Sequence, residues 1–212
     1  GKYHKGFRSP DRRRRTRLPI VVATLIFFSV WLNNSNGEGA PYEYVIDPDH
    51  FSIGFLVDHI GYAKILGMFR EAEGTFTFDE ETLELTDVLI TIRADSIFTN
   101  HKKRDAHLRG SDFLNSREFP EIVFEGTGSK ILDEKHGSVT GTLSLLGKSL
   151  PVALDVQWNK SGAYPFGHGK PTIGVSIRGA FNRSDYDMSY AVANGWVGDE
   201  IELIIELEAI RN

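Results

Sequence analysis

The chain has 212 residues, 41% of them hydrophobic and 25% charged, which is enough apolar material for one domain with a sizeable core. The formal net charge of -5 argues against a nucleic-acid partner. The absence of cysteine excludes a disulfide scaffold, a thiolate metal site and a lipid-modified cysteine anchor.

The first 40 residues have the composition of a targeting segment. A basic block at 12–17 precedes an almost unbroken apolar run at 18–32, and a polar stretch of small residues follows at 33–40. This order is typical of a secretory signal peptide, and the run is short for a membrane-spanning helix of about 20 residues. Because no Ala-x-Ala cleavage site is present, an uncleaved signal anchor is the alternative. We therefore predict a signal peptide or signal anchor at 1–40 that does not pack against a body at 41–212, which is periplasmic or secreted, or else membrane-tethered.

From residue 42 onward the dominant pattern is the alternation of apolar and polar residues that is typical of β-strands. In the last segment, apolar residues that we expect to face inward alternate with glutamates that we expect to face solvent: Ile201, Leu203, Ile205 and Leu207 against Glu202, Glu206 and Glu208. Similar runs lie at 88–94, 152–158 and 173–181. We count about eight strands with mostly short connections. The pattern predicts an all-β fold, either an antiparallel barrel or a sandwich.

Two segments break the alternation. Residues 101–119 are polar and are predicted to form a long loop or a short helix, and residues 59–68 are compatible with a short helical turn. The regular charges on the polar strand faces favour a barrel with an apolar interior over a membrane-spanning barrel, which has the opposite polarity. An eight-stranded barrel is just wide enough for one slender ligand. Gly141 and Gly179 are expected on the inward face, where they would leave space for one.

Several separated motifs resemble those of the YceI-like family, from about Tyr44 to about Ala209. They are Arg104-Asp105-Ala106-His107-Leu108-Arg109, Phe119-Pro120-Glu121-Ile122, the segment 141–149 with Gly141 and Gly147, Asp47-Pro48-Asp49-His50, and Phe181-Asn182-Arg183-Ser184-Asp185-Tyr186. Asp187 departs from the family pattern, which usually has glycine there. The resemblance implies a lipocalin-like extended antiparallel β-barrel that is exported and binds a polyisoprenoid lipid, such as a polyprenyl phosphate or a quinone-type tail.

The candidate site residues follow from this interpretation. The expected tunnel lining, which could equally be plain core packing, is Phe55, Phe69, Phe76, Phe113, Phe119, Phe124, Trp158 and Val175. The polar cluster Arg104, Asp105 and His107 is predicted either to hold a lipid head group or to fix the long loop on the barrel rim by a salt bridge. His101 and His107 lack a third ligand at a recognised zinc spacing, so no metal site is predicted.

No catalytic motif is present, and the sequence predicts a binding protein with no cofactor other than the lipid. The leading hypothesis is a carrier or buffer for an isoprenoid or other long-chain lipid. The alternatives are a barrel for fatty acids or fatty amides, a structural or stress-response barrel that is filled solid, and an enzyme acting on an isoprenoid. Transient membrane contact and a homodimer are both compatible with the sequence.

Overall fold

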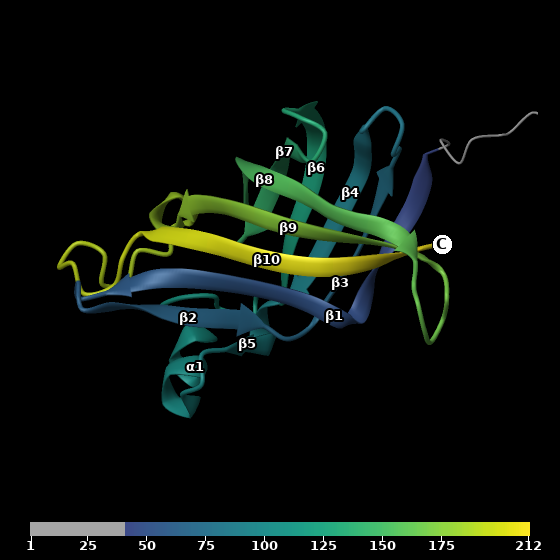
Figure 1. Cartoon of the computed structure of the whole chain (residues 1–212). Helices are drawn as coiled ribbons and strands as arrows, with labels where there is room; N and C mark the ends of the chain where they lie inside the picture. Colours follow the sequence, from purple (N-terminus) through teal and green to yellow (C-terminus); the bar gives the residue numbers. More distant parts are fainter. Residues whose placement is uncertain (1–40) are drawn as a thin grey trace, which may run out of the picture. The chain divides into compact units, whose positions relative to one another are not determined.

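The computed structural model describes residues 41–212 (Figure 1), so the predictions made for residues 1–40 lie outside the described part. The strands are β1 (Tyr42–His59), β2 (Ala63–Phe69), β3 (Ala72–Phe78), β4 (Leu85–Arg93), β5 (Ile97–Phe98), β6 (Glu121–Ile131), β7 (His136–Leu145), β8 (Lys148–Ala163), β9 (Pro171–Asn182) and β10 (Glu200–Arg211). The helices are η1 (Ala94–Ser96), α1 (Lys102–Leu108) and η2 (Arg183–Tyr186). Within the described range, no helix has the length and apolar character needed to cross a membrane.

Eight of the strands form a closed antiparallel barrel, which confirms the predicted fold class. Neighbouring strands pair in the order β10, β9, β8, β7, β6, β4, β3 and β1, and β1 closes the ring by pairing with β10. The first half of β1 pairs with β3, whereas its second half pairs with β2, to which the short β5 is added. The sheet therefore branches along β1, and the chain that leaves β5 enters α1 at one end of the barrel (Figure 1).

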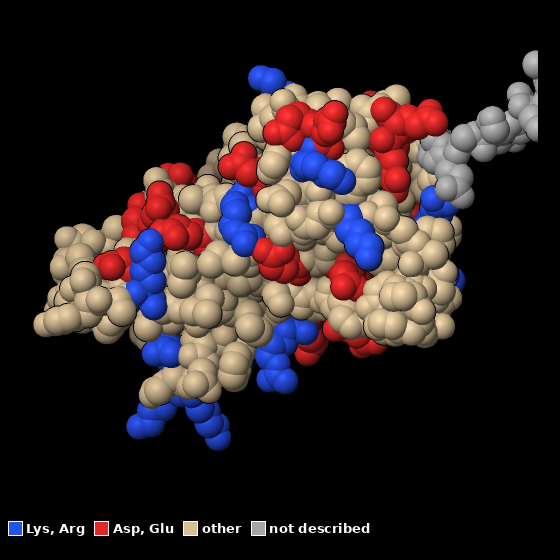
Figure 2. Space-filling model, viewed as in Figure 1, with Lys and Arg blue, Asp and Glu red and all other residues tan. Residues whose placement is uncertain are grey.

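Alternation sorts the side chains of each strand between the interior and the outer surface. Ile201, Leu203, Ile205 and Leu207 of β10 all face the interior cavity, as predicted. On the outer face, Glu206 accepts hydrogen bonds from Ser176 Oγ and from Arg178 Nη2, the latter at 2.7 Å. Figure 2 shows acidic and basic side chains spread over this outer surface.

The two segments without alternation behave differently from each other. Residues 101–119 begin with α1, whose first turn is capped by His101 Nδ1 accepting from the Arg104 backbone N–H at 3.1 Å. The predicted helical turn at 59–68 is wrong, because this stretch is the β1–β2 hairpin. Residues 63–69 pair with β1 along its second half, and this long-range pairing decides the conformation of a segment whose local pattern is weak.

The inward glycines do not leave open space. A Cβ atom on Gly141 would lie 2.3 Å from Cζ of Phe124, and one on Gly179 would lie 2.7 Å from a terminal methyl of Leu154. Neighbouring side chains have taken this room, so the expectation that these glycines widen a cavity is wrong. They instead leave room for the side chains of Phe124 and Leu154.

Candidate functional site

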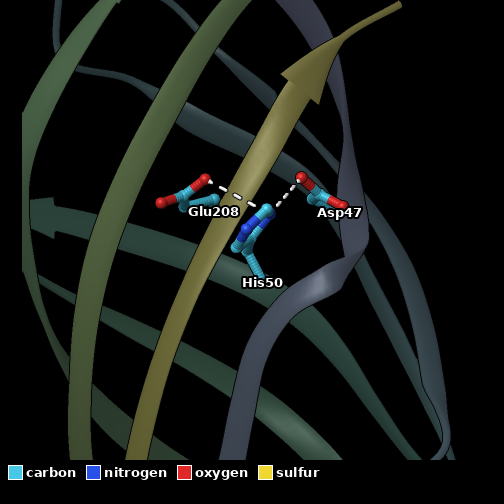
Figure 3. Close-up of side chains that lie close together, drawn as sticks. All are labelled: Asp47, His50 and Glu208. Atoms are coloured by element: carbon cyan, nitrogen blue, oxygen red, sulfur yellow. Dashed lines mark hydrogen bonds and ion pairs between the residues drawn. The ribbon is translucent and has the colours of Figure 1, made fainter. Parts of the chain in front are cut away.

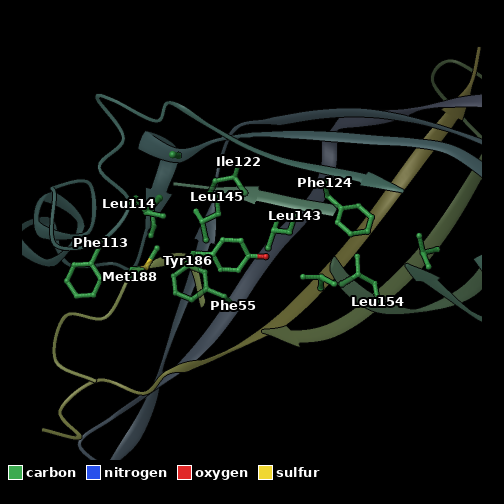
Figure 4. Packing of buried hydrophobic residues seen from close by; sticks show 14 residues of the cluster. Phe55, Phe113, Leu114, Ile122, Phe124, Leu143, Leu145, Leu154, Tyr186 and Met188 are labelled. Carbon is green, nitrogen blue, oxygen red and sulfur yellow. The ribbon is translucent and has the colours of Figure 1, made fainter. Parts of the chain in front are cut away.

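The barrel encloses a cavity of about 470 Å³, within the range of about 300–1,000 Å³ that is usual for ligand pockets. Every one of the eight barrel strands contributes to its wall, and the side chains are overwhelmingly aliphatic and aromatic. Figure 4 shows part of this wall, in which Phe55, Phe124, Leu143 and Leu154 converge from different strands. Such a space fits a long hydrocarbon chain better than a polar molecule.

One end of the cavity is closed by aromatic packing. Phe78 and Trp158 meet edge to face with ring centroids 5.4 Å apart, and the Trp158 indole N–H donates to Ser161 Oγ at 2.9 Å. The Lys135 ammonium lies 4.0 Å from the centre of the Trp158 ring on the outside. We call this the closed end, because the residues that line it are buried or half-buried.

The opposite end, beside α1, is polar and reaches solvent; we call it the open end. The polar residues that line the cavity all gather here: Asp58, His59, Thr99, Arg104, His107, Arg183 and Tyr190. Three lining residues are exposed in the described part of the chain, namely His59, His107 and Tyr190, and all three lie at this end. A ligand with an apolar tail and a polar head therefore has one orientation in which both parts are matched.

Arg104 and Asp105 each form hydrogen bonds with Thr99 and not with each other. Arg104 donates from Nε to Thr99 Oγ1 at 2.7 Å and from Nη2 to the Thr99 carbonyl at 2.6 Å. The buried Asp105 carboxylate accepts from the Thr99 N–H at 2.9 Å and from its hydroxyl. The predicted salt bridge that would fix the loop to the rim through this pair is not formed among the described residues, and hydrogen bonds to Thr99 take its place. Arg104 and His107 line the cavity, whereas Asp105 does not.

Arg183 is the most deeply placed cation of the open end. It is 1% exposed and lines the cavity, yet no carboxylate of the described residues is within ion-pair distance. Its guanidinium instead donates to four backbone carbonyls, those of Met188, Tyr190, Val197 and Gly198, at 2.8–3.0 Å. Burial lowers the pKa of Arg183, and the nearby Asp199 opposes this shift. The side chain thereby ties together the loop between η2 and β10.

Tyr186 carries an unpaired polar atom inside the apolar wall. The residue is 1% exposed, and its hydroxyl has no hydrogen-bond partner among the described residues. Its ring packs edge to face on Phe181 at 5.5 Å, and Figure 4 shows the hydroxyl directed toward Leu143. Burial, helped by the charge of Asp185, raises the pKa of Tyr186, so the phenol stays neutral. The sequence analysis singled out neither Arg183 nor Tyr186 as a site residue.

Most of the sequence-predicted lining residues surround the cavity. The residues that line it are Phe55, Phe69, Phe76, Phe113, Phe124, Trp158 and Val175. Phe119 does not line it: its ring covers Gly147, where an added Cβ would be 3.0 Å from the ring. Gly147 has φ of 74° in the turn between β7 and β8, and the ring of Phe119 packs over that turn. The prediction for Phe119 is therefore wrong.

Asp187 departs from the family's glycine at a position that favours glycine. It ends η2 in the left-handed conformation, with φ of 62° and ψ of 13°. Aspartate tolerates this region better than most residues do. Its carboxylate also lies 2.8 Å from Nζ of Lys148 at the start of β8. The local turn is thus kept despite the substitution.

A second polar cluster lies away from the cavity wall, in a bulge of β1 (Figure 3). Between the pairs Ile46–Ala209 and Phe51–Leu207, four residues of β1 stand opposite the single residue Glu208 of β10. Within this bulge His50 Nδ1 lies 2.8 Å from Asp47 Oδ2, and 3.8 Å from Glu208 Oε2.

The three side chains of this cluster offer ligand atoms within 4.8 Å of one another, a spacing at which imidazole and carboxylates can hold a metal ion. In the structure His50 itself joins the two carboxylates. The hydrogen bond to Asp47 raises the pKa of His50. Burial alone would raise the pKa of Asp47, but its bonds with His50 and the Asp49 N–H leave it lowered. The sequence analysis missed this cluster, although the Asp47-x-x-His50 spacing was its signal.

Comparison with known proteins agrees with this geometry. The family model described as YceI-like domain matches residues 44–209. The protein YceI of Salmonella arizonae is 34% identical over 203 residues, covering 93% of this chain and 98% of the relative. The crystal structure of the YceI protein of Campylobacter jejuni is 28% identical, with a TM-score of 0.67 over 73% of this chain and 90% of that one.

A more distant structure shares the fold. A polyisoprenoid-binding domain from Saccharophagus degradans is 10% identical and has a TM-score of 0.56, covering 82% of this chain and 100% of that domain. The match of the family model to most of the chain, and the identity with the Salmonella protein over almost its full length, decide the assignment. The chain belongs to the YceI-like family.

Proposed function

We propose that this protein is an exported carrier or buffer that holds a long polyisoprenoid lipid inside its barrel, with the tail toward Trp158 and the head group beside Arg104 and His107. The observation that carries the proposal is the polarity of the cavity along its length. The cavity wall is apolar from the closed end as far as the open end, where the polar lining residues gather. Each buried methylene of a bound chain contributes about 0.8 kcal/mol, so a slender apolar chain is held mainly by contact area.

The similarity to a polyisoprenoid-binding domain supports a lipid of this class, although it is a similarity of fold. A binding role without catalysis is consistent with a site whose two arginines are largely committed to protein oxygens. A fatty acid or fatty amide would fit the same apolar wall. A barrel filled solid is disfavoured by the cavity of about 470 Å³.

Identification of the lipid that co-purifies tests the proposal. Native mass spectrometry of the freshly purified protein, followed by solvent extraction, should give a ligand whose mass increments are isoprene units. Recovery of a fatty acid would assign the alternative ligand class. A protein that carries no lipid and takes up none from detergent solution contradicts the carrier hypothesis. An isoprenoid recovered in chemically altered form after incubation would instead indicate an enzyme.

The role of Arg104 in head-group binding can be tested separately. Two nitrogens of its guanidinium are engaged by Thr99, which leaves Nη1 available to an anionic head group. Arg104→Ala should weaken binding of a short polyprenyl phosphate more than that of the corresponding polyprenol. Lys160→Ala, which removes an exposed cation of β8 near the closed end, is the matched control. Equal losses for both lipids, together with lower thermal stability, would make Arg104 a structural anchor only.

A further inference from the structure

Exposed apolar side chains concentrate around the open end of the barrel. Seven of the twelve large hydrophobic residues that are exposed in the described part lie there: Ile60, Tyr62, Leu66, Met68, Phe98, Tyr190 and Trp196. Three of them form what we call the apolar tip: Ile60, Tyr62 and Trp196, which are 48%, 87% and 58% exposed. Large exposed apolar patches usually mark a binding surface rather than a folding requirement.

The apolar tip is built from two loops that are held together. The backbone N–H of Ile60, in the β1–β2 hairpin, donates to the carbonyl of Trp196 at 3.0 Å, and His59 pairs with Val197. Both loops project beyond the barrel at its open end (Figure 1). His59 and Val197 also line the cavity, so the tip is continuous with the cavity entrance.

The backbone of Ile60 points to a role for its side chain. Its φ is 55°, in the left-handed region, which is unfavourable for a β-branched residue. Glycine or asparagine would suit this hairpin position better, and the side chain packs into no core there because it is 48% exposed. An isoleucine that costs stability and contributes no core packing is explained if its side chain meets something outside the protein.

Basic side chains lie at the open end, on α1 and after the last residue of β2. Lys102 and Lys103 on α1 are exposed, and neither forms an ion pair with another described residue. Arg70 lies over the ring of Phe98, which continues the apolar surface along β2 and β5. Figure 2 shows a mostly uncharged end of the molecule, bordered by acidic and basic side chains, and further basic side chains projecting where Figure 1 places α1. Tryptophan and tyrosine beside lysine and arginine are the residues that anchor proteins in the headgroup region of a bilayer.

We infer that the apolar tip inserts into the interface of an anionic lipid bilayer and brings the cavity entrance to the membrane for lipid transfer. This inference rests on the proposed function, because a water-insoluble ligand has to be collected from a membrane. The rest of the body is rich in carboxylates, so attraction is confined to the basic side of the tip, within about 10 Å at ordinary salt. Binding should therefore be reversible and weakened by added salt.

Vesicle binding and lipid uptake test the inference together. Vesicles of 30% phosphatidylglycerol in phosphatidylcholine would be loaded with a fluorescent polyprenol, and sedimentation and transfer to the protein would be measured. Tyr62→Ser/Trp196→Ser should lower vesicle binding and the initial transfer rate about tenfold, because interfacial anchoring scales with buried apolar area. Lys102→Gln/Lys103→Gln should weaken binding about fivefold for each charge removed, and only for the anionic vesicles.

The matched control replaces exposed apolar residues at the other end of the barrel, Leu132→Ser/Phe166→Ser, which should leave binding and transfer unchanged.

Uptake of the same polyprenol from detergent solution separates the membrane inference from the carrier function. If the wild type binds polyprenol in detergent but vesicle binding is equal in all variants, the inference is overturned and the carrier function stands. If it takes up no polyprenol in either format, the carrier function fails. If Tyr62→Ser/Trp196→Ser instead converts a dimer to a monomer, the tip is an interface between two copies and the membrane inference is overturned.

Discussion

At the closed end of the barrel, Phe78 and Trp158 hold the wall together by contact between rings, whereas at the open end Arg183 and Arg104 give their N–H groups to backbone and hydroxyl oxygens. Contact between rings is non-directional and scales with area, so it tolerates substitutions of similar volume. Hydrogen bonds from a buried cation are directional, and each acceptor left behind is costly. The open end thus combines a defined loop geometry with a wall that a polar head group can approach.

Arg183→Met should produce the largest effect, since it removes the shared donor of four buried or partly buried backbone carbonyls. We expect the free energy of unfolding to fall by about 4 kcal/mol. Urea denaturation measures this, and hydrogen exchange should show faster opening at 187–199. Arg178→Met, which removes an exposed ion pair with Glu206, is the control and should cost less than about 1 kcal/mol. Equal midpoints for the two variants would mean that the guanidinium does not hold the open end.

Trp158→Ala tests the closed end. Removing a partly buried indole should lower the free energy of unfolding by about 3 kcal/mol and speed the release of bound lipid, because the cavity would open at its second end. Trp158→Phe should recover most of the stability, as expected where area rather than direction matters. Trp196→Ala, which removes an exposed indole at the other end, is the comparison. Urea denaturation gives the free energy of unfolding of each variant. An unchanged rate of lipid release in Trp158→Ala would show that this end is not the seal.

Tyr186→Phe should have a smaller effect of opposite sign. Removing a buried hydroxyl without a partner should raise the free energy of unfolding of the lipid-free protein by about 1 kcal/mol. In contrast, Tyr44→Phe should destabilise the protein slightly, because the equally buried Tyr44 hydroxyl donates to Glu80 at 3.4 Å. Thermal unfolding of the two delipidated variants makes the comparison. A destabilised Tyr186→Phe would indicate that the hydroxyl has a partner in solution.

The smallest effect is expected from titration of the Asp47–His50–Glu208 cluster. Because the pKa of His50 is raised, its contribution to the free energy of unfolding is fully present below pH 6.5. This contribution is lost as the pH rises through the pKa of His50 in the folded state. Because the pKa of Asp47 is lowered, its contribution to the free energy of unfolding is present above pH 3.8. This contribution is lost as the pH falls through the pKa of Asp47 in the folded state. The cluster should therefore stabilise the barrel most between about pH 4 and 6.5.

Chemical denaturation of the wild type and of His50→Gln across this range measures the contribution of the cluster. The difference in stability between the two proteins should shrink as the pH rises above that window. His136→Gln, which alters a histidine bonded to Asp133 in an exposed turn, is the control. A difference that stays constant with pH would show that His50 does not act through its charge.

The barrel could be predicted because alternation along β10 and β9 is a local signal that survives into the folded state. Residues 63–69 could not be assigned as a strand, since their conformation depends on pairing with β1. Most of the lining could be predicted from aromatic residues on apolar strand faces. Phe119 was wrongly included, because the sequence does not show that its ring packs over the Gly147 turn instead. The role of Arg183 depends on four carbonyls from a loop that only the folded chain brings together.

The pairing of β1 with β10 has a consequence for how the cavity comes into being. The two strands are separated by most of the described chain, so the last contact of the ring has a high sequence separation and is slow to form. Until β10 joins the ring, the other seven strands can form only an open sheet with its apolar face uncovered. Ligand capacity should therefore appear only once β10 has paired, and a chain truncated before Glu200 should bind a chaperone instead of a lipid.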